Sequence, residues 1–213
     1  MIKLFLFVLI PFLTLPKDNP PGTIYLKQNL YIDQIEVSNI AWIEYLYWLK
    51  VKYGDASKEV QNAMPDTEVW KALYKTDFKA SSIGNEFNYY PVVGISYEQA
   101  VAYCQWRSER VKETEYPKNV TYRLPTLEEF REVSTLHRKE TDQKDFNKEL
   151  NLYAAPEKVK GSHVLFLSDN VSEMTQTYGQ SFGGTFSEND EETYSYDGPQ
   201  KGLGFRCIAE LIE

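Results

Sequence analysis

The sequence predicts an α+β domain with short strands, few helices and much irregular loop. Three observations lead to this fold class. Residues 22–39 alternate apolar and polar side chains as a half-buried strand pair does, two helix starts carry capping-box patterns, and six glycines lie beyond position 178. Aromatic residues make up 15% of the chain, and the polar tips of its 16 tyrosines suit a loop-rich fold with many side-chain hydrogen bonds.

The first helix is predicted over residues 39–52, with Ser38 as its N-cap and Gly54 just past its end. Four side chains are expected to share its buried face: Ile40, Ile43, Leu46 and Tyr47. A second helix is expected to begin at residues 65–67. Three of its side chains fall on one face: Trp70, Leu73 and Tyr74.

Two further helices are predicted from capping boxes. Ser96 and Gln99 begin one of them, and this helix carries Ala100, Tyr103 and Cys104 on a buried side. Pro125 precedes the other, in which Thr126 caps the start and Glu129 stands three residues on, so that helix is expected over residues 127 to about 136.

The rest of the chain is predicted from composition. Residues 134–161 are polar and charged, which favours a long surface insertion. The segment HVLFL, residues 163–167, is expected to form a short strand, and SDNVSEM, residues 168–174, a turn rich in hydrogen-bond acceptors. FRCIAEL, residues 205–211, is expected to be the last strand.

The N-terminus resembles an export signal. Lys3 precedes an apolar run from Leu4 to Leu15, which is too short to span a bilayer and fits the apolar region of a secretory signal. We therefore expect residues 1–20 to be a signal peptide or N-terminal apolar segment and residues 21–213 to be one domain. The alternative is a buried strand or helix. An exported chain would be periplasmic or outer-membrane associated, and with no Cys after the run, membrane association is expected only through a partner or an uncleaved segment.

The charge balance bears on the class of partner. With 31 acidic and 23 basic residues the formal net charge is −8, and no basic stripe is present. Nucleic acid is therefore not expected as a partner, because its phosphates require clustered positive charge.

The chain contains two cysteines, Cys104 and Cys207. In an exported protein two distant cysteines most often form a disulfide, and closing a loop of about 100 residues adds roughly 4–5 kcal/mol in the chain-entropy model. The alternative is a pair of thiolates that bind a soft metal such as Cu(I).

Four stretches, in order, resemble the signature blocks of the formylglycine-generating (sulfatase-modifying factor) family. They are YPVVGISYEQAVAYCQW, YRLPTLEEFREV, DNVSEM and FGGTF followed by GFRC. The stretches MPDTEVW and CQWRSERV are similar to the gliding-motility and type IX secretion lipoproteins of that family. The resemblance implies a C-type-lectin-like, loop-rich α+β fold, and it implies that Cys104 pairs with Cys207.

The chemistry of the family requires residues that this chain lacks. Its catalytic members oxidise a substrate cysteine with O2 and copper held by two thiolates, and residues 185–203, where that pair would lie, contain no Cys. A second branch uses iron held by three histidines, whereas this chain has only His137 and His163. We therefore expect no catalytic residues and a non-catalytic domain.

One metal site follows from the resemblance. In family members the block that matches DNVSEM contributes oxygen ligands to calcium, and Asn170, Val171 and Glu173 stand at the matching positions. No other cofactor is expected. The alternative is a turn whose polar side chains satisfy the backbone without an ion.

The expected function is binding within a bacterial cell-envelope complex of the gliding-motility or type IX secretion type, with a protein as partner. The predicted partner surface fills the segment that holds the catalytic residues in the family: Glu188, Asp190, Glu191, Glu192, Tyr194 and Tyr196. Two alternatives stay open. One is a divergent metal-dependent oxidoreductase of the same superfamily, and the other is a lectin-like carbohydrate binder that uses the tyrosines of residues 194–196.

Overall fold

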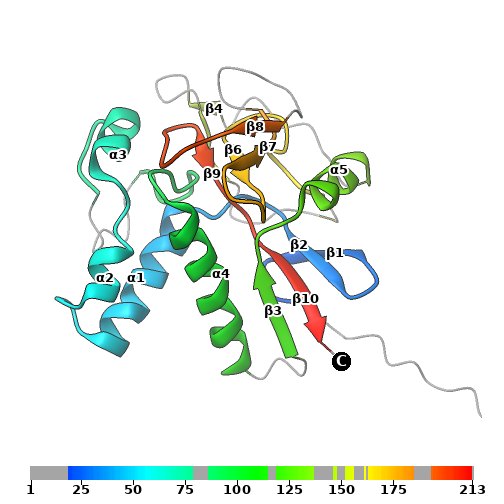
Figure 1. Ribbon diagram of the computed structural model, residues 1–213, viewed down its shortest axis with the longest axis horizontal. Coiled ribbons are helices and arrows are strands. Elements are labelled where there is room, and N and C mark those ends of the chain that lie inside the picture. Colours follow the sequence, from blue (N-terminus) through cyan, green and yellow to red (C-terminus); the bar gives the residue numbers. More distant parts are fainter. Residues whose placement is uncertain are drawn as a thin grey trace, which may run out of the picture.

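The computed structural model describes residues 19–78, 86–114, 119–136, 146–147, 152–155, 161, 163–184 and 193–212. The helices are α1 (Asn39–Tyr53), α2 (Lys58–Asn62), α3 (Thr67–Tyr74), α4 (Tyr97–Lys112) and α5 (Leu127–Leu136). Figure 1 shows α1, α2 and α3 along one side of the molecule, α4 next to them, and the strands and α5 on the other side. The predicted α+β class is confirmed. Across these described ranges no helix is long and apolar enough to cross a membrane.

The first sheet joins the two ends of the described chain. Its strands are β1 (Thr23–Lys27), β2 (Leu30–Asp33), β10 (Ile208–Ile212) and β3 (Asn119–Arg123), in the order β1-β2-β10-β3. All neighbours are antiparallel, and Ile208 in β10 lies opposite Ile32 on one side and Arg123 on the other. The predicted N-terminal strand pair is therefore extended by the C-terminal strand.

The second sheet is built from the glycine-rich C-terminal part. Its strands are β6 (Ser172–Met174), β7 (Gln180–Phe182), β8 (Thr193–Ser195) and β9 (Leu203–Gly204), in the order β8-β7-β6-β9. Strand β6 is antiparallel to β7 and parallel to β9. Two short strands, β4 (Phe146–Asn147) and β5 (Leu152–Tyr153), pair with each other inside the predicted surface insertion. Leu152 is fully buried, so part of that insertion packs against the core.

Local hydrogen bonds explain where the helices begin. Both expected capping boxes are present, with Ser96 bonded to Gln99 at the start of α4 and Thr126 bonded to Glu129 at the start of α5. Ser38 stands at the N-cap of α1, but its side chain makes no cap bond. The backbone N–H groups of residues 39 and 40 instead donate to the carbonyls of residues 90 and 88, so a distant loop satisfies this helix start.

Two of these local predictions were wrong, and one short helix was missed. Tyr47 is 56% exposed, and the buried face of α1 runs through Trp42 and Tyr45 instead. The segment at residues 163–167 forms no strand of either sheet, although residues 164–167 are buried. Helix α2 was not predicted, because its five residues are too few to show a period.

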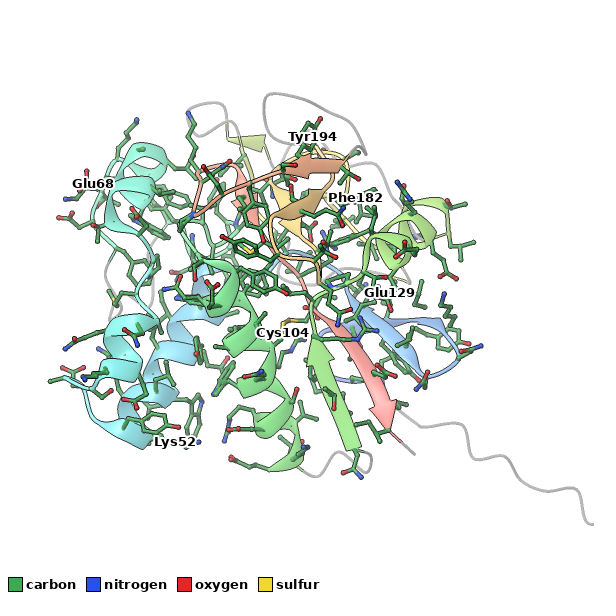
Figure 2. All side chains as sticks on the ribbon, in the orientation of Figure 1. Lys52, Glu68, Cys104, Glu129, Phe182 and Tyr194 are labelled. Atoms are coloured by element: carbon green, nitrogen blue, oxygen red, sulfur yellow. A yellow bond between two sulfur atoms is a disulfide. The ribbon has the colours of Figure 1, made fainter. Side chains whose placement is uncertain are left out.

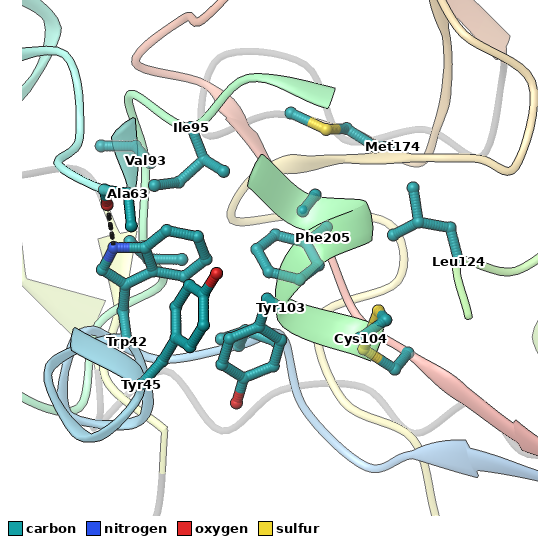
Figure 3. Packing of buried hydrophobic residues seen from close by; sticks show 14 of the residues in the cluster. Trp42, Tyr45, Ala63, Val93, Ile95, Tyr103, Cys104, Leu124, Met174 and Phe205 are labelled. Carbon is teal, nitrogen blue, oxygen red and sulfur yellow. Dashed lines mark hydrogen bonds between the residues drawn. A yellow bond between two sulfur atoms is a disulfide. The ribbon is translucent and has the colours of Figure 1, made fainter. Parts of the chain in front are cut away.

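The main core is aromatic and joins α1, α4 and the C-terminal segment. Trp42 stacks on Tyr103 with ring centroids 5.5 Å apart, and Phe205 meets both rings edge to face (Figure 3). The indole N–H of Trp42 donates to the carbonyl of Ala63 at 3.0 Å, so this large ring is buried without an unsatisfied donor. Each such ring adds about 2–3 kcal/mol of burial free energy.

Candidate functional site

The segments on either side of the expected catalytic interval flank one strand. Gly183 and Gly184 directly follow β7, and residues 204–207 begin at the last residue of β9. Both β7 and β9 pair with β6 in the second sheet. Gly183 has φ +91°, and a Cβ there would lie 2.4 Å from the carbonyl oxygen of Leu167. Only glycine fits this turn. The segment 185–192 between the two lies outside the described residues.

The two cysteines are joined in a disulfide, with their Cα atoms 6.3 Å apart. Cys104 lies on the buried side of α4 and Cys207 immediately before β10, so the bond ties the helix to the central strand of the first sheet (Figure 2). The predicted pairing is present. Because the chain contains only these two cysteines, it has no free thiol when the bond is formed.

A buried ion pair forms the centre of the site. The guanidinium of Arg206 donates from Nε and Nη2 to the two carboxylate oxygens of Glu173, both at 2.6 Å. The same guanidinium donates to the backbone carbonyls of Asp33 and Leu165. Both side chains are almost completely buried. Arg206 therefore ties β6 to the end of β2 and to the segment at residues 163–167.

A second buried carboxyl lies beside this pair. Glu36 is 4% exposed and accepts a hydrogen bond from the Nδ2 amide of Asn170 at 3.0 Å. Burial raises the pKa of Glu36 well above its usual range, and the negative charge of Glu173 raises it further, whereas Arg206 lowers it. Since both oxygens of Glu173 face Arg206, we assign the ionised state to Glu173 and the proton to Glu36. Sequence reasoning missed Glu36, because only the fold brings it to residue 170.

This arrangement bears on the expected calcium ligands. Asn170 and Glu173 lie together, with Val171 between them, but both oxygens of Glu173 are paired with Arg206. A guanidinium at that distance repels a calcium ion, so the Glu173 carboxylate does not fit as a ligand. The described residues contain no group of three or more His, Cys, Asp or Glu side chains that could hold a metal. Calcium at these residues stays a prediction.

Asp33 links the disulfide region to α4. One of its oxygens accepts hydrogen bonds from Arg107 at 2.6 Å and from the backbone N–H of Cys207 at 2.9 Å. Its other oxygen, Oδ1, is buried and has no hydrogen-bond partner among the residues that the structure describes. Arg107 also donates to the carbonyl of Pro21 and lies over the ring of Tyr122. The cluster therefore fixes the N-terminal strands against α4.

The predicted partner surface is described only in part. The four acidic residues at 188 and 190–192 lie outside the described residues. Tyr194 stands in the edge strand β8 and is half-buried (Figure 2), while Tyr196 is 7% exposed and packs near Tyr178. The carbohydrate-binding alternative requires the ring of Tyr196 to be exposed to solvent. Because Tyr196 is buried, this requirement is not met. His163 is exposed, and His137 lies outside the described residues.

Two hollows lie along α4, and no sequence pattern predicted either. One, of about 630 Å³, lies over the segment from Asp33 to Ser38 and is closed on its other side by Tyr103 and Arg107. The second, of about 700 Å³, runs between α1, α2 and α4. Trp106 lines both, so they meet along one face of α4.

Comparison with protein families gives a match over residues 11–163 to the sulfatase-modifying factor enzyme 1-like domain. The matched segment contains the first two signature blocks and ends before the buried pair of Arg206 and Glu173. No curated protein matches the chain in sequence.

Solved structures resemble most of the chain. The crystal structure of CarF is 14% identical, with a TM-score of 0.53, and the likeness covers 90% of this chain and 96% of that one. The structure of PvdO from Pseudomonas aeruginosa is also 14% identical with a TM-score of 0.53, covering 85% of this chain and 80% of that one. At this identity the likeness concerns the fold, and it includes the C-terminal part that the family match leaves out.

Proposed function

Because the chain belongs to the sulfatase-modifying factor enzyme 1-like domain family, we propose that it is a non-catalytic member of that family and works by binding a protein. One observation carries the proposal. The chain's two cysteines are bonded to each other, and none stands in the interval between Gly184 and Gly204 that would hold the copper-binding pair. Cu(I) requires soft thiolate ligands, which a disulfide cannot supply.

The setting we propose is a bacterial cell-envelope complex of the gliding-motility or type IX secretion kind. The stretches MPDTEVW and CQWRSERV support this branch, and the apolar run at residues 4–15 supports export. A disulfide is consistent with an oxidising compartment. In this setting the chain would be periplasmic or associated with the outer membrane through its partner.

We propose that the domain keeps a rigid shape to which the partner protein binds. The segment at residues 204–207, on one side of the catalytic interval in the family, is tied to α4 by the disulfide and to β6 by the pair of Arg206 and Glu173. These bonds make a rigid frame, and a rigid frame lowers the entropic cost of binding a partner.

Affinity capture from envelope extract tests the proposal. The full chain with a C-terminal tag, expressed in its native host, is expected to retain one envelope protein in constant ratio to itself, as judged by mass spectrometry. In parallel, the purified chain is incubated with a cysteine-containing peptide, copper and O2, and no formylglycine is expected. Catalytic turnover of the peptide would refute the proposal, and so would the absence of any stoichiometric partner.

A further inference from the structure

The hollow between α1, α2 and α4 has an aromatic and apolar floor. Tyr45, Leu49 and Ala63 are buried there, and the ring of Trp106 contacts Tyr45 at a centroid distance of 5.1 Å. The floor also carries an unsatisfied hydrogen-bond donor. The indole Nε1 of Trp106 is buried and lacks an acceptor among the described residues. We call this hollow the α1–α4 groove.

Large apolar side chains at the edge of the α1–α4 groove are exposed to water. Val51 is 58% exposed and Tyr53 is 46% exposed, and both line the groove at the end of α1. Trp48 lies on the same wall, with the guanidinium carbon of Arg110 3.8 Å from its ring centroid. Contiguous exposed apolar surface of this kind marks contact sites on soluble proteins.

The charge of the α1–α4 groove is negative. Four glutamates and two basic residues line it: Glu59, Glu98, Glu109, Glu113, Lys52 and Arg110. Lys52 pairs with Glu109, and Arg110 pairs with Glu113. Within the described part of the chain neither Glu59 nor Glu98 is paired with a basic side chain, so two carboxylates remain for a positively charged occupant.

The shape of the groove selects an elongated occupant. Its α4 wall runs from Glu98 to Glu113, which is about 22 Å along the helix at 1.5 Å per residue. Both long walls are helices (Figure 1), so they offer side chains and no open strand edge to which a peptide could add. A helix of about 15 residues matches this length, with apolar side chains on the floor and basic ones at the rim.

We propose that the α1–α4 groove is the docking site for a basic amphipathic helix of the partner protein. This inference rests on the proposed binding role and names both the surface and the chemistry of what it binds. It moves the contact away from the acidic loop expected from the sequence and onto two helices that the fold brings together. The apolar face of the partner helix covers Val51 and Tyr53, and its lysines or arginines face Glu59 and Glu98.

A synthetic peptide pair tests the chemistry of the α1–α4 groove. One is a 15-residue amphipathic helix with leucines on one face and lysines on the other, designed at roughly the length of the groove, and its twin carries glutamates in place of the lysines. By calorimetry on the full chain, the lysine peptide is expected to bind saturably and the twin about tenfold more weakly at low salt. Equal binding of the two peptides, or no binding of either, would overturn the proposal.

Matched variants locate the binding. Glu59→Gln/Glu98→Gln removes the two unpaired carboxylates of the groove, each from the first turn of its helix. Glu68→Gln/Glu128→Gln removes two exposed first-turn glutamates from α3 and α5, away from the groove. The first pair is expected to weaken the lysine peptide about fivefold and the second to leave it unchanged. An equal loss in both pairs would assign the effect to net charge and overturn the site.

A photocrosslinking residue at Gln105, which is exposed and lines the groove, identifies the occupant in the native envelope. A crosslink to a basic helical segment of the captured partner supports the proposal. A crosslink to a second copy of the chain, or to its own residues 1–18, overturns it. If the partner is captured equally by the Glu59→Gln/Glu98→Gln variant, the groove is wrong while the binding role stands. If the wild-type chain captures no envelope protein, the binding role fails, and the peptide measurements still decide the groove.

Discussion

Two arginine–glutamate pairs hold irregular segments of this molecule, and they differ in how much water reaches them. The side chains of Arg206 and Glu173 are 0% and 2% exposed, whereas those of Arg123 and Glu129 are 24% and 9% exposed. Both pairs are forked, with two hydrogen bonds from each guanidinium to its carboxylate. The two pairs therefore share one geometry and differ in burial and in their neighbours.

The two pairs should respond differently when the arginine is removed and its glutamate is left behind. Water can reach Glu129 if Arg123 is lost, and the backbone N–H of Thr126 still donates to that carboxylate. No such relief exists for Glu173, because Glu36 is its neighbour and burial already penalises both carboxyls. Removing one member of a buried pair is thus costly even where the net contribution of the pair to stability is small.

The largest effect is expected from Arg206→Met. It leaves Glu173 buried without a counter-charge and orphans two backbone carbonyls, so the free energy of unfolding in urea should fall by about 3–5 kcal/mol. The double variant Arg206→Met/Glu173→Met is expected to regain part of this loss, because it removes the unpaired charge. A single variant that loses less than about 1 kcal/mol would contradict the account.

The disulfide is a further difference between the two arginine–glutamate pairs. Cys207, which follows Arg206 in the chain, is bonded to Cys104, and Arg123 has no such neighbour in the chain. We expect Cys104→Ala/Cys207→Ala to lower the unfolding free energy by about 3 kcal/mol. This is less than the roughly 4–5 kcal/mol that the chain-entropy model gives for the closed loop, because residual structure in the unfolded chain reduces the effect of a cross-link. Urea unfolding of the wild-type chain with and without reductant provides the control. The reduced wild-type chain should match the double variant, and a mismatch would point to packing rather than to the cross-link.

The buried carboxyl of Glu36 is expected to make the stability of the folded chain depend on pH. Because burial raises the folded-state pKa of Glu36, its contribution to stability is complete below the unfolded pKa of about 4.3 and is lost as pH rises through the folded pKa. Glu36→Gln keeps an acceptor for Asn170 and cannot ionise. Thermal unfolding from pH 4 to pH 9 should show the variant a few degrees more stable at high pH and no more stable at low pH. Parallel curves for the two proteins would contradict the assigned proton.

The smallest effect is expected at the half-buried pair. Arg123→Met should cost about 1 kcal/mol, since Glu129 keeps its bonds within the capping box of α5. Arg123→Lys serves as the control, because it keeps the charge and loses the fork. If Arg123→Met destabilised the chain as much as Arg206→Met, burial would not explain the difference between the two pairs.

The sequence predicted features that depend on neighbours in the chain. The starts of α4 and α5 were predicted because Ser96 with Gln99 and Thr126 with Glu129 satisfy each other within three residues. The pairing of Cys104 with Cys207 followed from the family resemblance.

Features set by distant contacts could not be predicted in this way. The face of α1 was misread because α4 packs against Trp42 and Tyr45, and no local period records that contact. Residues 164–167 are apolar and buried but form no strand, and burial without strand pairing leaves the same sequence signal as a strand. The contact between Glu36 and Asn170 and the α1–α4 groove form only when separate parts of the chain come together in the fold.

The proposed non-catalytic role requires that this member of the family has no copper-binding thiols. The most direct measurement combines a thiol count under denaturing conditions with anaerobic Cu(I) titration of the oxidised chain against a competing chelator. We predict no free thiol and no copper bound in stoichiometric amount, because Cys104 and Cys207 are bonded to each other. One copper held per chain, and lost in Cys104→Ala/Cys207→Ala, would contradict the account and restore the enzymatic interpretation.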